Sequence, residues 1–230
     1  MPDVPYTILS CAITLDGYLD DTGDTPLHLS GPADLDRVDG VRSESDAILV
    51  GAATVRNDDP RLLVRAPARV AARRRRGTTD SPVKVTVSEH VKLDRDRAFF
   101  TTGDVEKLVY CPTARVDEGL QAFGDLATVV DGGDPVTMRH VAEDLYARGV
   151  RRLMVEGGAS VHTQFLTERL ADELQLVVAP FFLGDPRARR WVDGGDYRWC
   201  TAHHARLVET RALDDVVLVR YALSERCEAA

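Results

Sequence analysis

The sequence has no long hydrophobic run and no excess of basic residues, and each absence excludes a class of protein. No apolar stretch approaches the roughly 20 residues that a membrane-spanning helix needs. The segment Met1 to Tyr6 lacks the basic and apolar regions of a signal peptide, so we expect a cytoplasmic protein with no membrane partner. The formal net charge is −8. This charge disfavours a nucleic-acid partner, because such binding needs a basic surface that displaces counterions from phosphates.

Cysteine is scarce, and several motifs of familiar enzyme classes are missing. The four cysteines are scattered, with no Cys-x-x-Cys pair, which favours reduced thiols over disulfides or metal ligands. His203 and His204 have no histidine or cysteine at metal-binding spacing, so we expect no metal site. The chain lacks the zinc deaminase signature, the Gly-x-Ser-x-Gly elbow and a Walker phosphate loop. We therefore predict that it carries no deaminase or serine hydrolase activity.

The hydrophobic pattern predicts alternating strands and helices. Strands are expected at 6–14, 47–50, 83–87, 107–111, 127–130, 150–155, 174–180, 205–210 and 216–223, and helices at 32–45, 135–149 and 159–170. No linker is long enough to separate two domains, so residues 1–230 are predicted to form one α/β domain with its core at about 6–222. The sheet is expected to be mostly parallel, with antiparallel C-terminal strands and flanking helices.

Two segments outside the strands carry specific expectations. Leu35, Val38 and Val41 recur at a three-residue spacing, which predicts an apolar stripe on the first helix. Residues 66–82 include Arg73 to Arg76, show no sustained periodicity, and are predicted to be a flexible basic loop.

A dense group of polar residues follows the expected strand Ala47 to Val50. The strand ends at Gly51, and Thr54, Arg56, Asn57, Asp58, Asp59, Arg61 and Arg65 come within the next fourteen positions. Ligands of open α/β sheets gather at the carboxyl ends of the strands, so this location suits a cofactor or a substrate. A simple surface turn at Asp-Asp-Pro is the alternative.

A second candidate site lies at Glu156-Gly157-Gly158, between an expected strand and an expected helix. The first turn of a helix offers unpaired backbone N–H groups, and glycine allows a phosphate to approach them closely. The sequence is not the Gly-x-Gly-x-x-Gly fingerprint, and a tight turn without a ligand needs the same glycines. Glu156 at the strand end favours a site, since its carboxylate can accept hydrogen bonds from a substrate.

Taken together, these segments resemble the reductase domain of riboflavin biosynthesis, which has a dihydrofolate-reductase-like fold. The likeness extends in order from about Tyr6 to Tyr221 and rests on Thr14-Leu15-Asp16-Gly17, Asp46 to Gly51, Thr54-Val55, Asp58-Asp59-Pro60-Arg61-Leu62, Val155 to Gly158, Leu170-Ala171-Asp172-Glu173-Leu174, Val178-Ala179-Pro180 and Leu183-Gly184.

The resemblance implies an activity and two ligands. NADPH would reduce a ribosylaminopyrimidine 5′-phosphate to its ribitylamino form, with hydride passing to C1′ of the opened ribose. The protein would mainly orient the two ligands, since the nicotinamide carries the hydride chemistry. Asp58 or Glu156 would be the catalytic residue that supplies or relays the proton, and the sequence leaves water open as the donor. A monofunctional homodimer is implied, with the strand near Val216 to Leu223 at the interface.

The resemblance also implies the binding residues. The substrate would contact Thr25, Arg42, Leu62, Arg65 and Glu156. The cofactor would contact Ala12, Leu27, Gly51, Thr54, Asp58, Ser88, Gly157, Gly158, Ala159, Ser160 and Val161, in a segment that continues to Gln164.

Two positions depart from the family pattern. Bacterial bifunctional enzymes often place a substrate-binding lysine where Ser10 stands, and its absence is closer to archaeal and fungal reductases that act before deamination. Glu89 follows Ser88 near the expected 2′-phosphate of NADPH and would repel it, so Lys84 or an arginine from Arg73 to Arg76 is expected to compensate.

Two other functions stay open, and the departures at Ser10 and Glu89 favour the first of them. One is a reductase of the same fold that acts on another imine or on a pteridine, because a fold does not fix its substrate. The other is a nucleotide-binding protein without catalysis. The joint presence of Thr54, Asp58, Arg65 and Glu156 argues against that second alternative.

Overall fold

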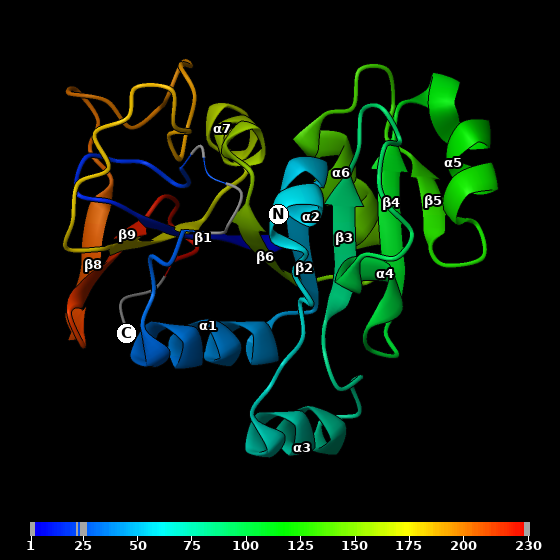
Figure 1. Ribbon diagram of the computed structural model, residues 1–230, viewed down its shortest axis with the longest axis horizontal. Helices are drawn as coiled ribbons and strands as arrows, with labels where there is room; N and C mark the ends of the chain where they lie inside the picture. The colour runs from blue at the N-terminus through cyan, green and yellow to red at the C-terminus, as the bar shows by residue number, and fades with distance from the viewer. Residues whose placement is uncertain (1–2, 22, 24–26, 228–230) are drawn as a thin grey trace.

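The computed structural model describes residues 3–21, 23 and 27–227, and its centre is one twisted sheet of nine strands (Figure 1). The strands are β1 (Tyr6–Ile13), β2 (Ala47–Gly51), β3 (Val83–Val87), β4 (Lys107–Cys111), β5 (Thr128–Asp131), β6 (Arg152–Gly157), β7 (Glu173–Val178), β8 (Arg206–Leu213) and β9 (Val216–Ala222). Their order across the sheet is β5-β4-β3-β2-β6-β1-β7-β9-β8. β1 to β7 are parallel, β9 is antiparallel to β7, and β8 is antiparallel to β9. The predicted α/β architecture is confirmed.

Helices cover both faces of the sheet. They are α1 (Pro32–Glu44), α2 (Ala52–Asp58), α3 (Pro67–Arg75), α4 (Ala98–Thr101), α5 (Val116–Phe123), α6 (Met138–Ala147) and α7 (Ala159–Thr167), with a 3-10 turn η1 (Thr113–Arg115). Among the described helices, none is long and apolar enough to cross a membrane.

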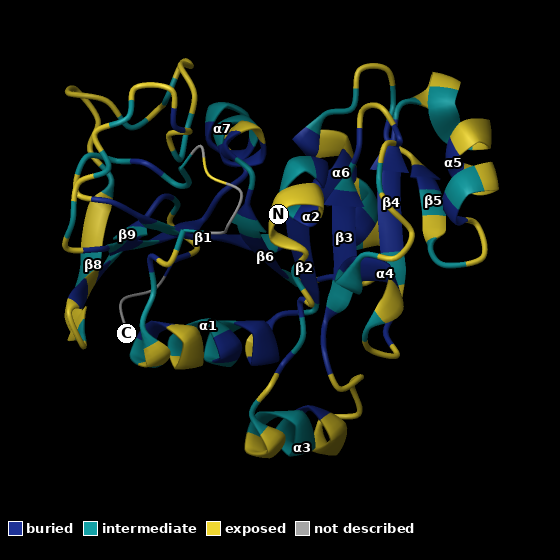
Figure 2. Cartoon of the chain, in the orientation of Figure 1, coloured by how far each residue is buried: buried dark blue, intermediate teal, exposed yellow. Residues whose placement is uncertain are grey.

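The core divides into two main layers because successive side chains of a strand point to opposite faces. In β2, Leu49 packs in the layer that includes α6 and α7, whereas Ile48 and Val50 pack in the layer that includes α2, α4 and α5. Every residue of β2 is buried, as expected for a central strand of a parallel sheet. Figure 2 shows this buried central region in dark blue and the exposed outer surface of α3 and α5 in yellow.

The apolar stripe predicted for α1 is only partly present. Val38 and Val41 pack against the core, but Leu35 keeps 43% of its surface exposed. The buried residues of α1 are instead polar: Asp34, Asp39, Arg42 and Ser43. Asp34 and Arg42 border a cavity, whereas Asp39 accepts hydrogen bonds from the backbone N–H groups of Arg65 and Ala66, just before α3.

The prediction of a flexible basic loop at 66–82 is wrong for about half of that segment, because the segment contains α3. Pro67 occupies the first turn, where its missing N–H costs nothing, and the following alanines and arginines favour a helix. Arg73 is buried and donates to the carbonyls of Ser43 and Ser45 at the end of α1. The segment therefore anchors α1. The hydrophobic pattern does not predict the helices α2, α4 and α5.

Candidate active site

Two glycine turns meet at the carboxyl ends of the neighbouring strands β2 and β6. Gly158 has a φ of 93°, which favours glycine, and a Cβ added there would lie 3.6 Å from the Cα of Gly51. A Cβ on Gly51 would in turn lie 3.2 Å from Cγ2 of Val161. Because α2 and α7 begin directly after these turns, the close approach brings the N-termini of two helices to one edge of the sheet.

Three adjoining cavities form a cleft along this edge. We call them the outer, middle and inner cavities, with volumes of about 600, 350 and 340 Å³. Arg56, Gly158 and Arg189 line both the outer and the middle cavity. Leu27, Asp58 and Glu156 line both the middle and the inner cavity. These shared walls make the cleft continuous.

Most of the predicted site residues border this cleft. The outer cavity is bordered by Gly51, Ser88, Gly158, Ser160 and Val161, the middle one by Leu27, Thr54, Asp58, Glu156, Gly157, Gly158 and Ala159, and the inner one by Ala12, Leu27, Arg42, Asp58 and Glu156. Cofactor and substrate residues predicted from separate parts of the sequence are thus brought together. Their individual roles remain predictions.

Three predicted substrate residues are not among those that border the cleft: two lie away from it, and one falls outside the residues that the structure describes. Leu62 is buried in the core at 1% exposure. Arg65 is exposed, and its backbone N–H donates to Asp39 Oδ1 at 2.5 Å. Among the described residues, Arg65 lines none of the three cavities. Thr25 falls outside the described residues. For these positions the predicted substrate contacts stay predictions.

Glu156 is held by Arg42 in a two-pronged ion pair. Arg42 Nε donates to Oε1 at 2.6 Å, and a second guanidinium nitrogen donates to Oε2 at 2.5 Å. Both side chains are almost buried, at 9% and 12% exposure. Burial alone would lower the pKa of Arg42, but the charge and hydrogen bonds of Glu156 outweigh it and raise the pKa. Arg42 thus fixes the orientation of the Glu156 carboxylate.

Asp58 stands at the junction of the middle and inner cavities, at the C-terminus of α2. The side chain reaches solvent, but partial desolvation by the cleft, together with the charge of Asp20, raises its pKa to about 6. A carboxyl with such a pKa can hold a proton near neutral pH and release it to a substrate. Asp58 is therefore the described residue of this cleft best suited to proton transfer.

The prediction that Lys84 or an arginine from Arg73 to Arg76 compensates Glu89 is wrong. Lys84 is fully buried under α4, donates to the carbonyls of Phe99 and Thr102, and has its pKa lowered to about 8 by burial. The segment Arg73 to Arg76 lies in and after α3, where Arg73 bonds α1. Neither can offset Glu89 at the outer cavity.

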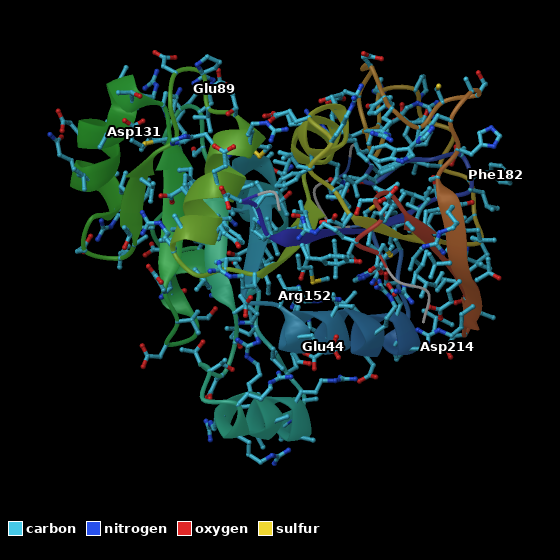
Figure 3. All side chains as sticks on the ribbon, turned by 180° about the vertical axis from the view of Figure 1, so that it is seen from behind. Glu44, Glu89, Asp131, Arg152, Phe182 and Asp214 are labelled. Carbon is cyan, nitrogen blue, oxygen red and sulfur yellow. The ribbon has the colours of Figure 1, made fainter. Side chains whose placement is uncertain are left out.

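Two arginines and one lysine supply that charge. Arg56, His90, Lys92 and Arg189 border the outer cavity beside Glu89. Arg56 is held over the rim by a 3.2 Å hydrogen bond to the carbonyl of Lys92. Figure 3 shows Glu89 at the upper end of the molecule, and Glu44 at the C-terminal end of α1 in the lower half. Arg56 belongs to the polar stretch after β2 that the sequence analysis singled out. No local sequence pattern indicates that Lys92 or Arg189 borders the same cavity.

Within the described residues, no group of three or more histidine, cysteine or carboxylate side chains could hold a metal ion.

Comparison with known proteins places these features in a family. Residues 5–219 match the family model described as the RibD C-terminal domain. A 2,5-diamino-6-ribosylamino-4(3H)-pyrimidinone 5′-phosphate reductase from Methanothermobacter thermautotrophicus is 36% identical over 94% of this chain and 97% of its own length. The protein of the same name from Archaeoglobus fulgidus is 32% identical over 84% of this chain and 88% of its own length.

A solved structure shows the same fold. The pyrimidine reductase-like protein from Corynebacterium diphtheriae superposes with a TM-score of 0.82 at 21% identity and covers 95% of this chain and 91% of its own.

Proposed function

Because the chain belongs to the RibD C-terminal domain family, we propose that it is a pyrimidine reductase of riboflavin biosynthesis. The substrate proposed is the 2,5-diamino-6-ribosylamino-4(3H)-pyrimidinone 5′-phosphate named in two similar proteins. The product is the corresponding ribitylamino compound. The observation that carries the proposal is the junction of the middle and inner cavities, where Asp58 and Glu156 face one space.

The outer and middle cavities fit a nicotinamide dinucleotide. The turn at Gly158 leaves open the space that a Cβ would fill, and the first N–H groups of α7 are available there for a pyrophosphate. Thr54 and Ala159 border the middle cavity, where the nicotinamide would meet the substrate. The bound cofactor supplies the hydride for C1′ of the opened ribose.

The chain's own residues would orient the substrate and move a proton. Arg42 fixes Glu156, so that its carboxylate can accept hydrogen bonds from ribose hydroxyls without reorganising. Asp58, protonated below a pKa of about 6, would donate its proton to the nitrogen on C1′ as that carbon is reduced. Leu27 and Ala12 border the inner cavity and would limit water there.

NADPH is the proposed cofactor, in preference to NADH. Arg56, Lys92 and Arg189 border the outer cavity, where the extra phosphate would lie, and these three cations outnumber Glu89. Guanidinium and ammonium groups are strong phosphate ligands.

A homodimer is proposed as the working assembly. The predicted interface strand, β9, lies inside the sheet, and β8 is the edge strand. Leu207 on β8 and Val217 on β9 leave about half of their surfaces exposed, at 53% and 45%, and give this end an apolar character. Light scattering that gives the mass of one chain would contradict the dimer.

Isotope transfer tests the reaction itself. The protein is mixed with the diaminopyrimidinone substrate and NADPH that carries deuterium at both C4 positions of the nicotinamide. We expect a ribitylamino product one mass unit heavier than that formed with ordinary NADPH, with deuterium at C1′ by NMR. A reduced product without deuterium at C1′ would contradict direct hydride transfer.

A further inference from the structure

The turn Thr14 to Gly17 follows β1 and has no part in the site described above. Among the described residues, it lines none of the three cavities. Its Asp16 carboxylate accepts the backbone N–H groups of Leu183 and Gly184, at 3.1 and 2.8 Å, and the Thr14 hydroxyl at 2.6 Å. The turn therefore holds the segment that follows β7.

Further contacts join the same two parts of the chain. The backbone N–H of Leu19 donates to the carbonyl of Arg189 at 2.8 Å, and Tyr18 and Arg190 form an antiparallel bridge. The Arg190 guanidinium lies over the Tyr18 ring at 4.9 Å. We call residues 14–19 and 181–190 the clasp. Figure 1 shows its two segments side by side, in blue and gold.

Helix α7 holds the chain directly after the clasp. The backbone N–H of Asp193 donates to Thr163 Oγ1 at 2.8 Å. The rings of Trp191 and His162 meet edge-on, with their centroids 6.3 Å apart. Arg189 lies between the clasp contacts and these helix contacts, so its backbone is fixed on both sides.

The Arg189 side chain differs from its neighbours because it is not used within the protein. Arg187 pairs with Asp185, and Arg190 covers Tyr18. In the part of the chain that the structure describes, the Arg189 guanidinium has no hydrogen bond or ion pair. Its N–H donors, about five in number, are therefore free to bind a ligand.

This guanidinium lies at the boundary of two cavities. Arg189 borders the outer and the middle cavity, together with Gly158 at the start of α7. Arg56 borders both cavities as well, but it is held at the rim by its hydrogen bond to the carbonyl of Lys92. In the proposed function the nicotinamide occupies the middle cavity and the 2′-phosphate the outer rim. The pyrophosphate that joins the two halves of the cofactor would therefore lie at this boundary.

We propose that Arg189 binds the pyrophosphate of the nicotinamide dinucleotide, and that the clasp, through Asp16, positions Arg189 for this contact. The inference rests on the proposed function for the location of the dinucleotide. A guanidinium suits the role, because it can donate to two phosphate oxygens at once. NADPH and NADH carry the same pyrophosphate, so Arg189 should contribute equally to the binding of both.

Fluorescence titration with each cofactor tests the contact without requiring turnover. Arg189→Met should raise the Kd for NADPH and for NADH by about tenfold, the loss expected for a charge-assisted hydrogen bond. Arg187→Met is the matched control, because it removes the same charge from the same segment. Arg187 is exposed and, among the described residues, lines none of the three cavities. The control should leave both Kd values unchanged.

A double-mutant cycle tests the positioning by the clasp. Asp16→Asn weakens the hold on Leu183 and Gly184 and should raise both Kd values by about threefold or more. In an Arg189→Met chain the same substitution should raise them no further, since the clasp acts through that side chain. Arg190→Met breaks the clasp at the Tyr18 contact and should show the same dependence, which provides the test if Asp16→Asn does not fold.

Each outcome decides one part of the inference. Unchanged Kd values in Arg189→Met overturn it, as does a loss confined to NADPH, which would place Arg189 at the 2′-phosphate. An equal loss in Arg187→Met also overturns it, because the effect would then be one of general charge. Independent, multiplying effects of the clasp and Arg189 variants overturn the positioning. Binding that depends on Arg189 without reduction of the pyrimidine instead contradicts the proposed function and leaves this inference standing.

Discussion

Arg42 on α1 holds both carboxylate oxygens of Glu156 at the end of β6, at 2.6 and 2.5 Å, across 114 positions of sequence. This pair joins the polar face of α1 to the sheet at the edge where the cleft opens. Arg42 Nη1 also donates to the carbonyl of Leu63 at 3.2 Å, which ties the segment after α2 to the same point. The pair thus contributes both to the site and to the packing of α1.

Removal of Arg42 should destabilise the fold. Arg42→Met leaves the Glu156 carboxylate nearly buried without its partner, a change that typically costs about 3 to 5 kcal/mol. Urea denaturation measures the loss. Arg74→Met is the control: Arg74 pairs with Asp80 at the surface, so its loss should change the free energy of unfolding far less. Equal effects of the two variants would contradict the structural role of the pair.

Loss of the Asp58 carboxyl should slow turnover and alter its pH dependence. A proton donor works in its protonated form, so kcat of the wild-type enzyme should fall as pH rises through about 6. Asp58→Asn should lower kcat by about 100-fold or more and remove this limb from the pH profile. Steady-state rates from pH 5 to 8 provide the measurement. Near-normal turnover in the variant would assign the proton to another group or to water.

A methyl group on Gly158 should weaken cofactor binding. In Gly158→Ala the new Cβ would lie 3.5 Å from Val161 and occupy the approach to the first turn of α7. Gly149→Ala is matched in backbone strain, because Gly149 has a φ of 95° against 93°, but its Cβ would meet no atom within 4 Å. Both variants should lose about 1 to 2 kcal/mol of stability. Only Gly158→Ala should raise the Kd for NADPH, measured by fluorescence titration, and equal Kd values would remove this turn from the cofactor site.

Opposite charge changes at the outer cavity should move the NADPH preference in opposite directions. Lys92→Ala removes one cation from the rim and should raise the Kd for NADPH about tenfold, equivalent to about 1.4 kcal/mol. Glu89→Gln removes the carboxylate from the same rim and should lower that Kd. The Kd for NADH should change little in either variant. Parallel changes for both cofactors would show that this rim does not contact the 2′-phosphate.

More of the fold than of the candidate site could be predicted from the sequence. Strand β2 and the turn at Gly157-Gly158 are local signals, since a short apolar run ended by glycine has few other structures available. The polar stretch with Asp58 and the turn at Glu156 were noticed because they come at the ends of expected strands, but the roles of both residues were implied by the family resemblance. The pairing of Glu156 with Arg42 is a long-range contact, so no pattern along the chain could give it.

The errors had physical causes as well. Leu35 fits the helical period, but α1 faces a polar cavity, and only the tertiary packing decides which face of a helix is buried. Arg73 was assigned to a loop because a basic run resembles a solvated surface, yet its guanidinium satisfies three backbone carbonyls. Lys92 and Arg189 reach the outer cavity from segments with no periodic signal.

The most direct test of the proposed function is the loss of NADPH absorbance at 340 nm when the protein is mixed with the diaminopyrimidinone 5′-phosphate. We predict oxidation of one NADPH per substrate molecule, with much slower oxidation when the deaminated pyrimidine is supplied. No oxidation with either pyrimidine, in a preparation that still binds NADPH, would contradict the assignment as a pyrimidine reductase.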